Sequence, residues 1–256
     1  MSPYGSQSID PEPTLTVTRS GQGSDWVVFV HGVLGTGASF ERVAEHLGPR
    51  CEVAWYDRRG YGMATCDEPP GVDGHAADLV GVVGDGPALV VGHSFGGVTA
   101  LAATAQAPDL VRGLMLYETS VAWAPGWDDT VMGEVLASKH PEEAALRLML
   151  GSRYDALTGE DRHRRLREGR AFIAEERSVR SGGATFDLAS ITCPVLYGRS
   201  SVSVMPEVVD YLRGALVGFH EEILPGAGHH AHRSDPERFA GLIRRALELV
   251  NQQHSL

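Results

Sequence analysis

Leu89-Val90-Val91-Gly92-His93-Ser94-Phe95-Gly96-Gly97 is the stretch that decides the predicted fold. Leu89 to Val91 form an apolar run typical of a buried strand, and the small residues that follow Ser94 are typical of a closely packed helix. Gly92 and Gly96 have no Cβ atoms, so the strand can turn sharply into the helix without a collision. The pattern therefore predicts a strained, exposed serine between a strand and a helix.

We interpret Ser94 as a nucleophile. At the N-terminus of a helix, free backbone N–H groups and the positive end of the helix dipole can stabilise an oxyanion. Gly-x-Ser-x-Gly occurs by chance in many proteins, but a preceding strand and a following helix are the context that a nucleophile elbow requires. The alternative is a tight turn in which Ser94 only caps the helix.

Short apolar runs recur on both sides of this turn, and helical stretches alternate with them. The expected strands span residues 15–19, 26–30, 53–56, 88–91, 114–117, 194–197 and 221–224. The expected helices span residues 39–47, 75–83, 94–106, 206–216 and 236–249. Continuous apolar runs indicate strands that are covered on both faces. The alternation therefore predicts an α/β fold with a doubly wound, mostly parallel sheet.

One segment interrupts the alternation. From Val121 to about Ala189 the sequence has helical stretches but no strong strand. The expected helices here span residues 130–139, 142–150 and 160–179. Such an insertion predicts a helical lid over the carboxyl edge of the sheet, where open α/β folds bind ligands. We therefore expect a core of residues 1–120 and 190–256, with residues 121–189 as a cap.

Two sets of residues in this cap allow more than one interpretation. Five apolar side chains could line an acyl pocket or form the cap's own core: Trp123, Trp127, Met132, Leu146 and Met149. Residues 161–168 are rich in arginine and could suggest an anion site. Their mixed charges at helical spacing favour a solvated helix face instead.

Composition narrows the class of protein. A chain of 256 residues with net charge −11, and with no run of Lys or Arg on a strand or groove-like segment, would repel polyanions, so we expect no nucleic-acid partner. Residues 1–12 lack a secretory signal and no apolar run reaches about 18 residues, so we expect a cytoplasmic protein without a membrane partner. Three cysteines without metal-type spacing fit reduced thiols.

Further motifs, in the same order along the chain, resemble the α/β-hydrolase family. His31-Gly32 follows the strand that ends at Val30, as in the oxyanion loop of that family. Residues 56–62 resemble its Asp-x-Arg-Gly-x-Gly segment. Residues 228–232 and 235–239 are similar to its Gly-His-x-x-His and Pro-x-x-Phe ending. The resemblance covers nearly the whole chain and implies an α/β-hydrolase fold with a serine hydrolase site.

The resemblance also implies roles for individual residues. His229 matches the family's base, which would activate a serine hydroxyl that is a poor nucleophile at neutral pH. The backbone N–H groups of Phe95 and Val33 match the two oxyanion donors. His230 and His232 are expected to pack or cap nearby. A metal site of the three histidines lacks a recognised ligand spacing, so we expect neither a metal nor a cofactor.

The acid of the triad departs from the family pattern. Most relatives have Gly-x-x-Asp after a late strand, whereas this chain reads Gly198-Arg199-Ser200-Ser201, and Ser201 cannot stabilise an imidazolium. Glu118 lies at the carboxyl end of an earlier buried strand, where some members of the superfamily place this acid. We therefore choose Glu118 as the catalytic acid. The alternatives for this position are Glu207, Asp210 or a water-filled gap. Glu118 itself could instead serve as a capping residue where the chain enters the lid, or form an ion pair.

The expected reaction is hydrolysis of a small or medium apolar carboxylic ester, lactone or thioester through an acyl-enzyme on Ser94. The same triad would also suit a C–C bond hydrolase or a cofactor-free haloperoxidase or perhydrolase. A different class of function is a catalytically retired receptor that binds a ligand in the lidded pocket. The expected partner is a small apolar acyl substrate, and the expected assembly is a monomer or a homodimer.

Overall fold

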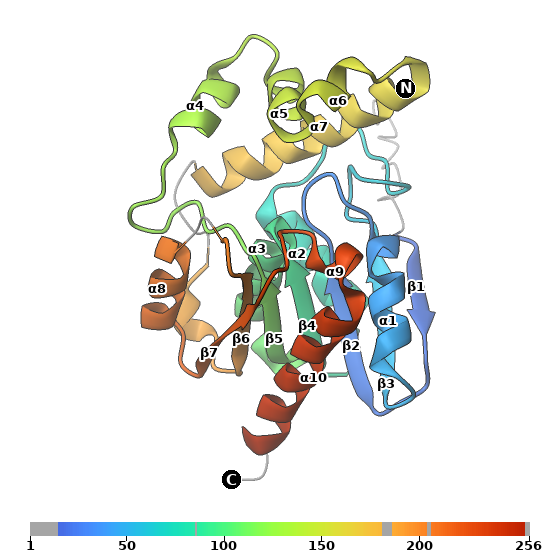
Figure 1. Ribbon diagram of the computed structural model, residues 1–256, viewed down its shortest axis with the longest axis vertical. Coiled ribbons are helices and arrows are strands. Elements are labelled where there is room, and N and C mark those ends of the chain that lie inside the picture. The colour runs from blue at the N-terminus through green and yellow to red at the C-terminus, as the bar shows by residue number, and fades with distance from the viewer. Residues whose placement is uncertain (1–14, 85, 181–185, 204–205, 254–256) are drawn as a thin grey trace, which may run out of the picture.

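A seven-stranded sheet forms the centre of the computed structural model, which describes residues 15–84, 86–180, 186–203 and 206–253 (Figure 1). The strands are β1 (Val17–Ser20), β2 (Asp25–Val30), β3 (Cys51–Tyr56), β4 (Ala88–His93), β5 (Val111–Tyr117), β6 (Val195–Ser200) and β7 (Phe219–Leu224). They lie in the order β1-β3-β2-β4-β5-β6-β7. Only β1 and β3 pair antiparallel among these described strands. The predicted mostly parallel sheet is confirmed.

Helices cover both faces of the sheet (Figure 1). One face packs against α1 (Glu41–Leu47) and α10 (Pro236–Gln253). The other packs against α2 (Val72–Val83), α3 (Phe95–Gln106) and α8 (Pro206–Ala215). Strand β2 shows why the strands are continuously apolar. Val27 and Phe29 pack on the face that α1 and α10 cover, and Val28 and Val30 pack on the opposite face. All four side chains are fully buried.

The element boundaries differ from the prediction in a few places. Helix α3 begins at Phe95 rather than at Ser94, because Ser94 has a positive φ that no helix contains. Helix α9 (Ala231–Ser234) was not predicted, since four residues are too few to show a helical period. The same limit applies to the 3₁₀ turns, which are η1 (Gly37–Phe40), η2 (Pro108–Leu110) and η3 (Leu188–Ser190).

The insertion after β5 is helical, as predicted. It comprises α4 (Thr130–Ala137), α5 (Pro141–Leu150), α6 (Ser152–Asp155) and α7 (Gly159–Arg180). These helices lie together above the sheet domain and form the cap (Figure 1). Residues 1–14 and 181–185 lie outside the described residues. The domain limits at 120, 121, 189 and 190 stay a prediction.

The five apolar side chains of the insertion have different environments. Trp123 and Trp127 pack against the main core beside the sheet. Leu146 is fully buried in α5, and Met132 packs against a small apolar cluster within the cap. Met149 is 44% exposed and lines a cavity beside the loop of residues 31–35. Of the five, Met149 therefore has the surroundings expected of a pocket residue, and the others serve the packing of core and cap.

A buried polar network joins α7 to the sheet domain. Arg58, in the loop after β3, forms an ion pair with Glu175 of α7, and both side chains are fully buried. Tyr61 donates its hydroxyl hydrogen to Glu175 at 2.8 Å, and His75 Nε2 lies 3.0 Å from the same carboxylate. Burial opposes the charge of Glu175, but Arg58 keeps the pKa of this carboxyl below its usual value. The cap is therefore held by a charged contact from which water is excluded.

The interpretation of residues 161–168 as a solvated face is wrong for part of the segment. Asp161 and Arg164 form an exposed pair, as expected. Glu168 is only 4% exposed and pairs with Arg165 at 2.6 Å. Arg165 also donates to the carbonyl oxygen of Leu34 at 3.2 Å. The sheet domain covers this side of α7, and the charge pattern along one helix does not reveal such a tertiary contact.

Two expectations from composition can be compared with the described residues. Cys51, Cys66 and Cys193 are free thiols, and Cys51 is buried. Within the described ranges, no helix combines the length and the apolar character needed to cross a bilayer.

Replacing the buried acid should weaken the whole fold. We expect Glu175→Gln to lower the free energy of unfolding by about 3–5 kcal/mol, because it leaves the Arg58 charge buried without a counter-ion. Urea unfolding followed by tryptophan fluorescence measures this loss. The matched control is Glu248→Gln, which removes the same charge from an exposed pair with Arg245 on α10 and should change stability little. Equal losses in both variants would contradict this assignment.

Candidate functional site

Ser94 lies at the sharp turn between β4 and α3. It is buried, with 8% of its surface exposed, so the predicted exposure is wrong, because the surrounding segments cover the turn. Its φ of 53° and ψ of −125° place it outside the regions that side chains favour, at a cost of about 1–3 kcal/mol. Two backbone hydrogen bonds hold this conformation. The N–H of Ser94 donates to the carbonyl oxygen of Tyr117 at 2.9 Å, and the N–H of Gly97 donates to that of Ser94 at 2.9 Å. The strain is thus imposed by the neighbouring strand and the first turn of the helix.

The glycines of the turn are required by close backbone contacts. A Cβ atom on Gly92 would lie 2.5 Å from the Cα of Gly97. A Cβ atom on Gly96 would lie 2.2 Å from the carbonyl oxygen of Val30, at the end of β2. Gly96 therefore allows α3 to approach the neighbouring strand as well as the turn itself. This second contact joins the elbow to the loop that follows β2.

That loop, residues 31–35, passes directly beside the serine. A Cβ atom on Gly32 would lie 2.8 Å from the Cβ of Ser94. Val33 follows Gly32 in this loop, and Phe95 is the first residue of α3. N–H groups in the first turn of a helix have no partner within the helix, so that of Phe95 can serve a ligand. The backbone around Ser94 therefore comes from the two segments in which the oxyanion donors are expected.

The loop is positioned by His31 and Arg58. The backbone N–H of Arg58 donates to His31 Nε2 at 2.9 Å, and the Arg58 Nε–H donates to the His31 carbonyl oxygen at 2.9 Å. Because Nε2 accepts a hydrogen bond, the ring proton lies on Nδ1, which donates to the Gly32 carbonyl oxygen at 2.7 Å. Burial keeps the pKa of His31 well below its usual value. A neutral histidine with one defined tautomer thus supports the loop.

Glu118 and His229 lie close together at the carboxyl edge of the sheet. Glu118 follows β5 directly, with a φ of 47°, and His229 lies in the loop after β7. The Glu118 Oε2 is 3.8 Å from His229 Nδ1. The carboxylate also accepts hydrogen bonds from the Ser200 N–H at 2.7 Å and the Ser203 hydroxyl at 3.2 Å. Glu118 is buried, whereas 40% of the His229 side chain is exposed to solvent.

The surroundings of Glu118 favour its charged form. Burial alone would raise the pKa of this carboxyl, but the neighbouring His229 ring and the Ser200 N–H together lower it below its usual value. Glu118 is therefore an anion at neutral pH, and it faces the ring nitrogen of a histidine.

The alternative acids lie elsewhere. Asp210 pairs with Arg213 on the exposed side of α8. Glu207 is also exposed and lies beside Gly126. The hydroxyl of Ser201, at the position where the family pattern predicts an aspartate, accepts a hydrogen bond from the Gly226 N–H at 3.4 Å. Among the described residues, the contact of a carboxylate with His229 is therefore made by Glu118.

Two residues that the sequence did not single out hold the His229 loop. His93, which precedes Ser94, donates from Nε2 to the His229 carbonyl oxygen at 2.7 Å, and the two rings lie 4.7 Å apart. Tyr117, which precedes Glu118, donates its hydroxyl hydrogen to the Gly228 carbonyl oxygen at 3.0 Å. Their position next to the candidate residues is the signal that could have identified them. They fix the third segment of the site relative to the other two.

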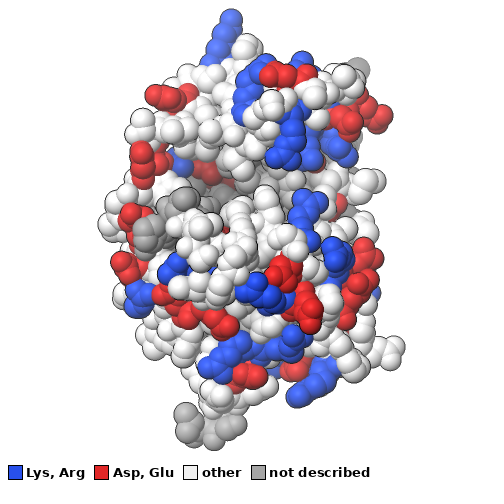
Figure 2. Space-filling model, viewed as in Figure 1, with Lys and Arg blue, Asp and Glu red and all other residues white. Residues whose placement is uncertain are grey.

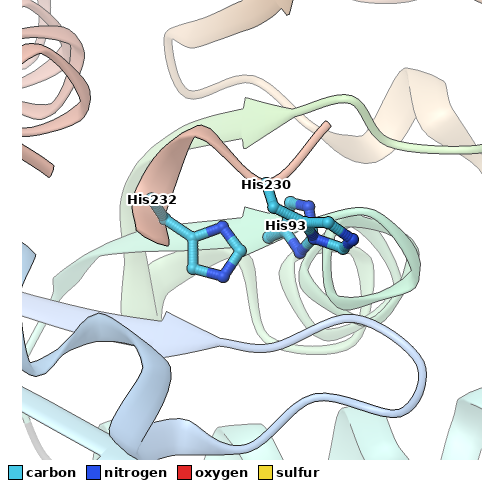
Figure 3. A group of neighbouring side chains, drawn as sticks. All are labelled: His93, His230 and His232. Atoms are coloured by element: carbon cyan, nitrogen blue, oxygen red, sulfur yellow. The ribbon is translucent and has the colours of Figure 1, made fainter. Parts of the chain in front are cut away.

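A group of histidines near the serine could hold a metal ion. Figure 3 shows the rings of His93, His230 and His232 beside the end of β4, and one nitrogen atom from each ring lies within 4.8 Å of the other two. The group considered from the sequence contained His229 in place of His93. Burial lowers the pKa of His232 to about 3, and it also lowers that of His93 and His230. All three rings are therefore neutral at pH 7.

Two observations argue against a metal ion at this group of histidines. One ring nitrogen of His93, Nε2, already donates a hydrogen bond to the His229 carbonyl oxygen. Arg153 and Arg233 lie close enough to His230 for their charges to add to the effect of burial on its pKa. The same positive charges would repel a metal cation.

Comparison with known proteins places this chain in a family. The model of the alpha/beta hydrolase family matches residues 27–242. Lipase LipV of Mycobacterium tuberculosis is 37% identical over 128 residues, which are 48% of this chain and 49% of that protein, so the match spans about half of each. The 2-(acetamidomethylene)succinate hydrolase of Mesorhizobium japonicum is 28% identical, and the match covers 88% of each protein.

Solved structures show the same fold. That of a thermophilic esterase from Thermogutta terrifontis has a TM-score of 0.73 at 20% identity, over 92% of this chain and 93% of that one. The family match spans most of the chain, and the curated relatives include a lipase. The chain therefore belongs to the alpha/beta hydrolase family and is an esterase- and lipase-like enzyme.

Proposed function

We propose that this enzyme is a serine hydrolase that cleaves a small or medium apolar carboxylic ester, lactone or thioester through an acyl-enzyme on Ser94. The observation that carries the proposal is the contact of the buried Glu118 carboxylate with His229 Nδ1 at 3.8 Å. This contact leaves the opposite ring nitrogen, Nε2, available to the nucleophile. Glu118 thus supplies the charge that Ser201 cannot.

In the first half of the reaction, the Ser94 hydroxyl oxygen attacks the carbonyl carbon while His229 accepts its proton. Glu118 keeps the proton of His229 on Nδ1 and stabilises the imidazolium that forms. The carbonyl oxygen becomes an alkoxide, which the N–H groups of Phe95 and Val33 stabilise. The C–O or C–S bond then breaks, and the leaving group takes its proton from His229.

In the second half, water attacks the acyl-enzyme and His229 accepts the proton of this water. The second alkoxide occupies the same oxyanion site. Its collapse releases the acid and returns the proton to Ser94. Arg58 and His31 touch no reacting atom and act by positioning the loop that carries Val33.

Removing the nucleophile should abolish both chemistry and labelling. We expect Ser94→Ala to lower kcat for p-nitrophenyl butanoate by at least about 10⁴-fold and to prevent labelling by a fluorophosphonate probe. Mass spectrometry of the labelled protein identifies the modified residue. Ser190→Ala, an exposed serine of η3, is the control and should keep full activity. Folded wild-type enzyme that the probe does not label would favour the receptor function over the hydrolase.

Removing the charge of Glu118 should slow turnover with little effect on substrate binding. We expect Glu118→Gln to lower kcat by roughly 10²–10⁴-fold with KM changed little, because the amide neither fixes the His229 tautomer nor stabilises its charged form. Steady-state kinetics on the same ester measures both constants. Asp210→Asn, which removes an equal charge from α8, and Ser201→Ala should both remain near wild type. An unchanged kcat in Glu118→Gln would refute the role of this acid.

A further inference from the structure

A cavity of about 240 Å³ lies between the cap and the loop beside Ser94. The oxyanion loop forms one wall, and Met149 and Leu150 of α5 form an apolar part of the opposite wall. The cavity also reaches His93, which precedes the serine in the chain. Ser94 does not line the cavity, but Gly32 does, and Gly32 lies directly beside Ser94. A substrate held at Ser94 could therefore extend into the cavity.

The charge of this cavity is unusual for the chain. Its lining includes Arg153 of α6, Arg165 of α7 and Arg233 of α9, and none of the described lining residues is acidic. The whole chain carries 22 Lys and Arg against 33 Asp and Glu. On the face shown in Figure 2, Lys and Arg side chains lie on both sides of the boundary between cap and sheet domain.

The three arginines differ in what they already bind. Arg165 pairs with Glu168 at 2.6 Å and donates to the Leu34 carbonyl oxygen, so its charge is largely compensated. Arg153 and Arg233 form no ion pair with any residue in the described ranges, and both are exposed at the cavity. These two guanidinium groups therefore remain available to a ligand.

The histidines of the cavity are compatible with an anion. Because His230 and His232 have lowered pKa values, they are neutral at pH 7, and each can donate one hydrogen bond without adding charge. The N–H of the neutral His93 ring is already donated to the His229 carbonyl oxygen. Guanidinium groups bind carboxylate and phosphate in a bidentate manner. Two positive guanidinium groups together with neutral histidines therefore favour an anion over a metal ion in this cavity.

We propose that this cavity is a subsite for an anionic oxygen group of the substrate, bound by Arg153 and Arg233, with Met149 and Leu150 contacting the apolar chain that connects it to the scissile carbonyl. The proposal rests on the proposed function of Ser94 and revises its substrate class: the substrate is apolar in the chain next to the scissile carbonyl but carries an anionic group beyond it. The anion is either a terminal carboxylate of the acyl chain or a phosphate on the leaving group.

Two matched pairs of substrates separate these sources. The first pair is mono-p-nitrophenyl adipate and p-nitrophenyl hexanoate, which have equal chain lengths and differ in the terminal carboxylate. The second pair is hexanoyl-phosphopantetheine and hexanoyl-pantetheine, which differ in the phosphate. We expect kcat/KM of wild-type enzyme to be at least about tenfold higher for the charged member of one pair, because one charge-assisted hydrogen bond to the anion contributes about this much.

The arginine variants test the position of the subsite. Arg153→Gln and Arg233→Gln should each lower the charged-to-neutral ratio of kcat/KM by about tenfold. Arg245→Gln removes the same charge from α10 and should leave the ratio and the activity unchanged. Arg165→Gln would not distinguish anion binding from loop position, because Arg165 also supports the oxyanion loop.

Calorimetry makes the test independent of turnover. Monomethyl adipate or phosphopantetheine should bind to Ser94→Ala, and adding Arg233→Gln should weaken that binding about tenfold. Hydrolysis of the neutral esters without preference for either anion, or binding of Zn²⁺ but of neither anion, would overturn the subsite alone. Absence of hydrolysis and of fluorophosphonate labelling, with anion binding intact, would instead refute the proposed function of Ser94.

Discussion

The buried guanidinium of Arg58 is the group on which the relative positions of cap, oxyanion loop and elbow depend. It pairs with Glu175 of α7, donates to the carbonyl oxygen of His31 and lies 5.5 Å from the ring centre of Phe95. A charge without water requires a counter-ion and hydrogen bonds in good geometry. Arg58 can therefore be buried only when three segments far apart in the sequence are in place together.

This constraint also fixes the direction of α7. Glu175 anchors the helix at one point, and Arg165 contacts the carbonyl oxygen of Leu34 at another. Ten residues separate these contacts, which is a distance of about 15 Å along a helix. Two anchors at this separation set the orientation of the helix as well as its position. The cavity with Arg153 and Arg233 thus has one wall, α7, that is rigidly tied to the backbone beside Ser94.

Local signals explain what the sequence could predict. The strand and helix around Ser94 and the continuous apolar strands are patterns within a few residues, and they predicted the elbow and the parallel sheet. The pair of Arg58 and Glu175 spans 117 positions, and no spacing rule connects such residues. The charges around Arg165 were wrongly interpreted as solvated, because helical spacing does not show which face another element covers. The catalytic roles themselves remain proposals, although the structure brings Glu118 to His229.

The position of Glu118 can be understood from the pairing of β5 with β6. The two strands are parallel neighbours, so their carboxyl ends meet at one edge of the sheet, and the Glu118 N–H donates to the Gly198 carbonyl oxygen at 3.1 Å. The positive φ of Glu118 is strained, yet its side chain reaches the turn after β6 and accepts the Ser200 N–H. The resemblance to the family predicts an aspartate next to Ser200, at position 201. Glutamate has a longer side chain than aspartate, so Glu118 can place its carboxylate at the end of the adjacent strand β6. There the Ser200 N–H and the Ser203 hydroxyl donate hydrogen bonds to that carboxylate.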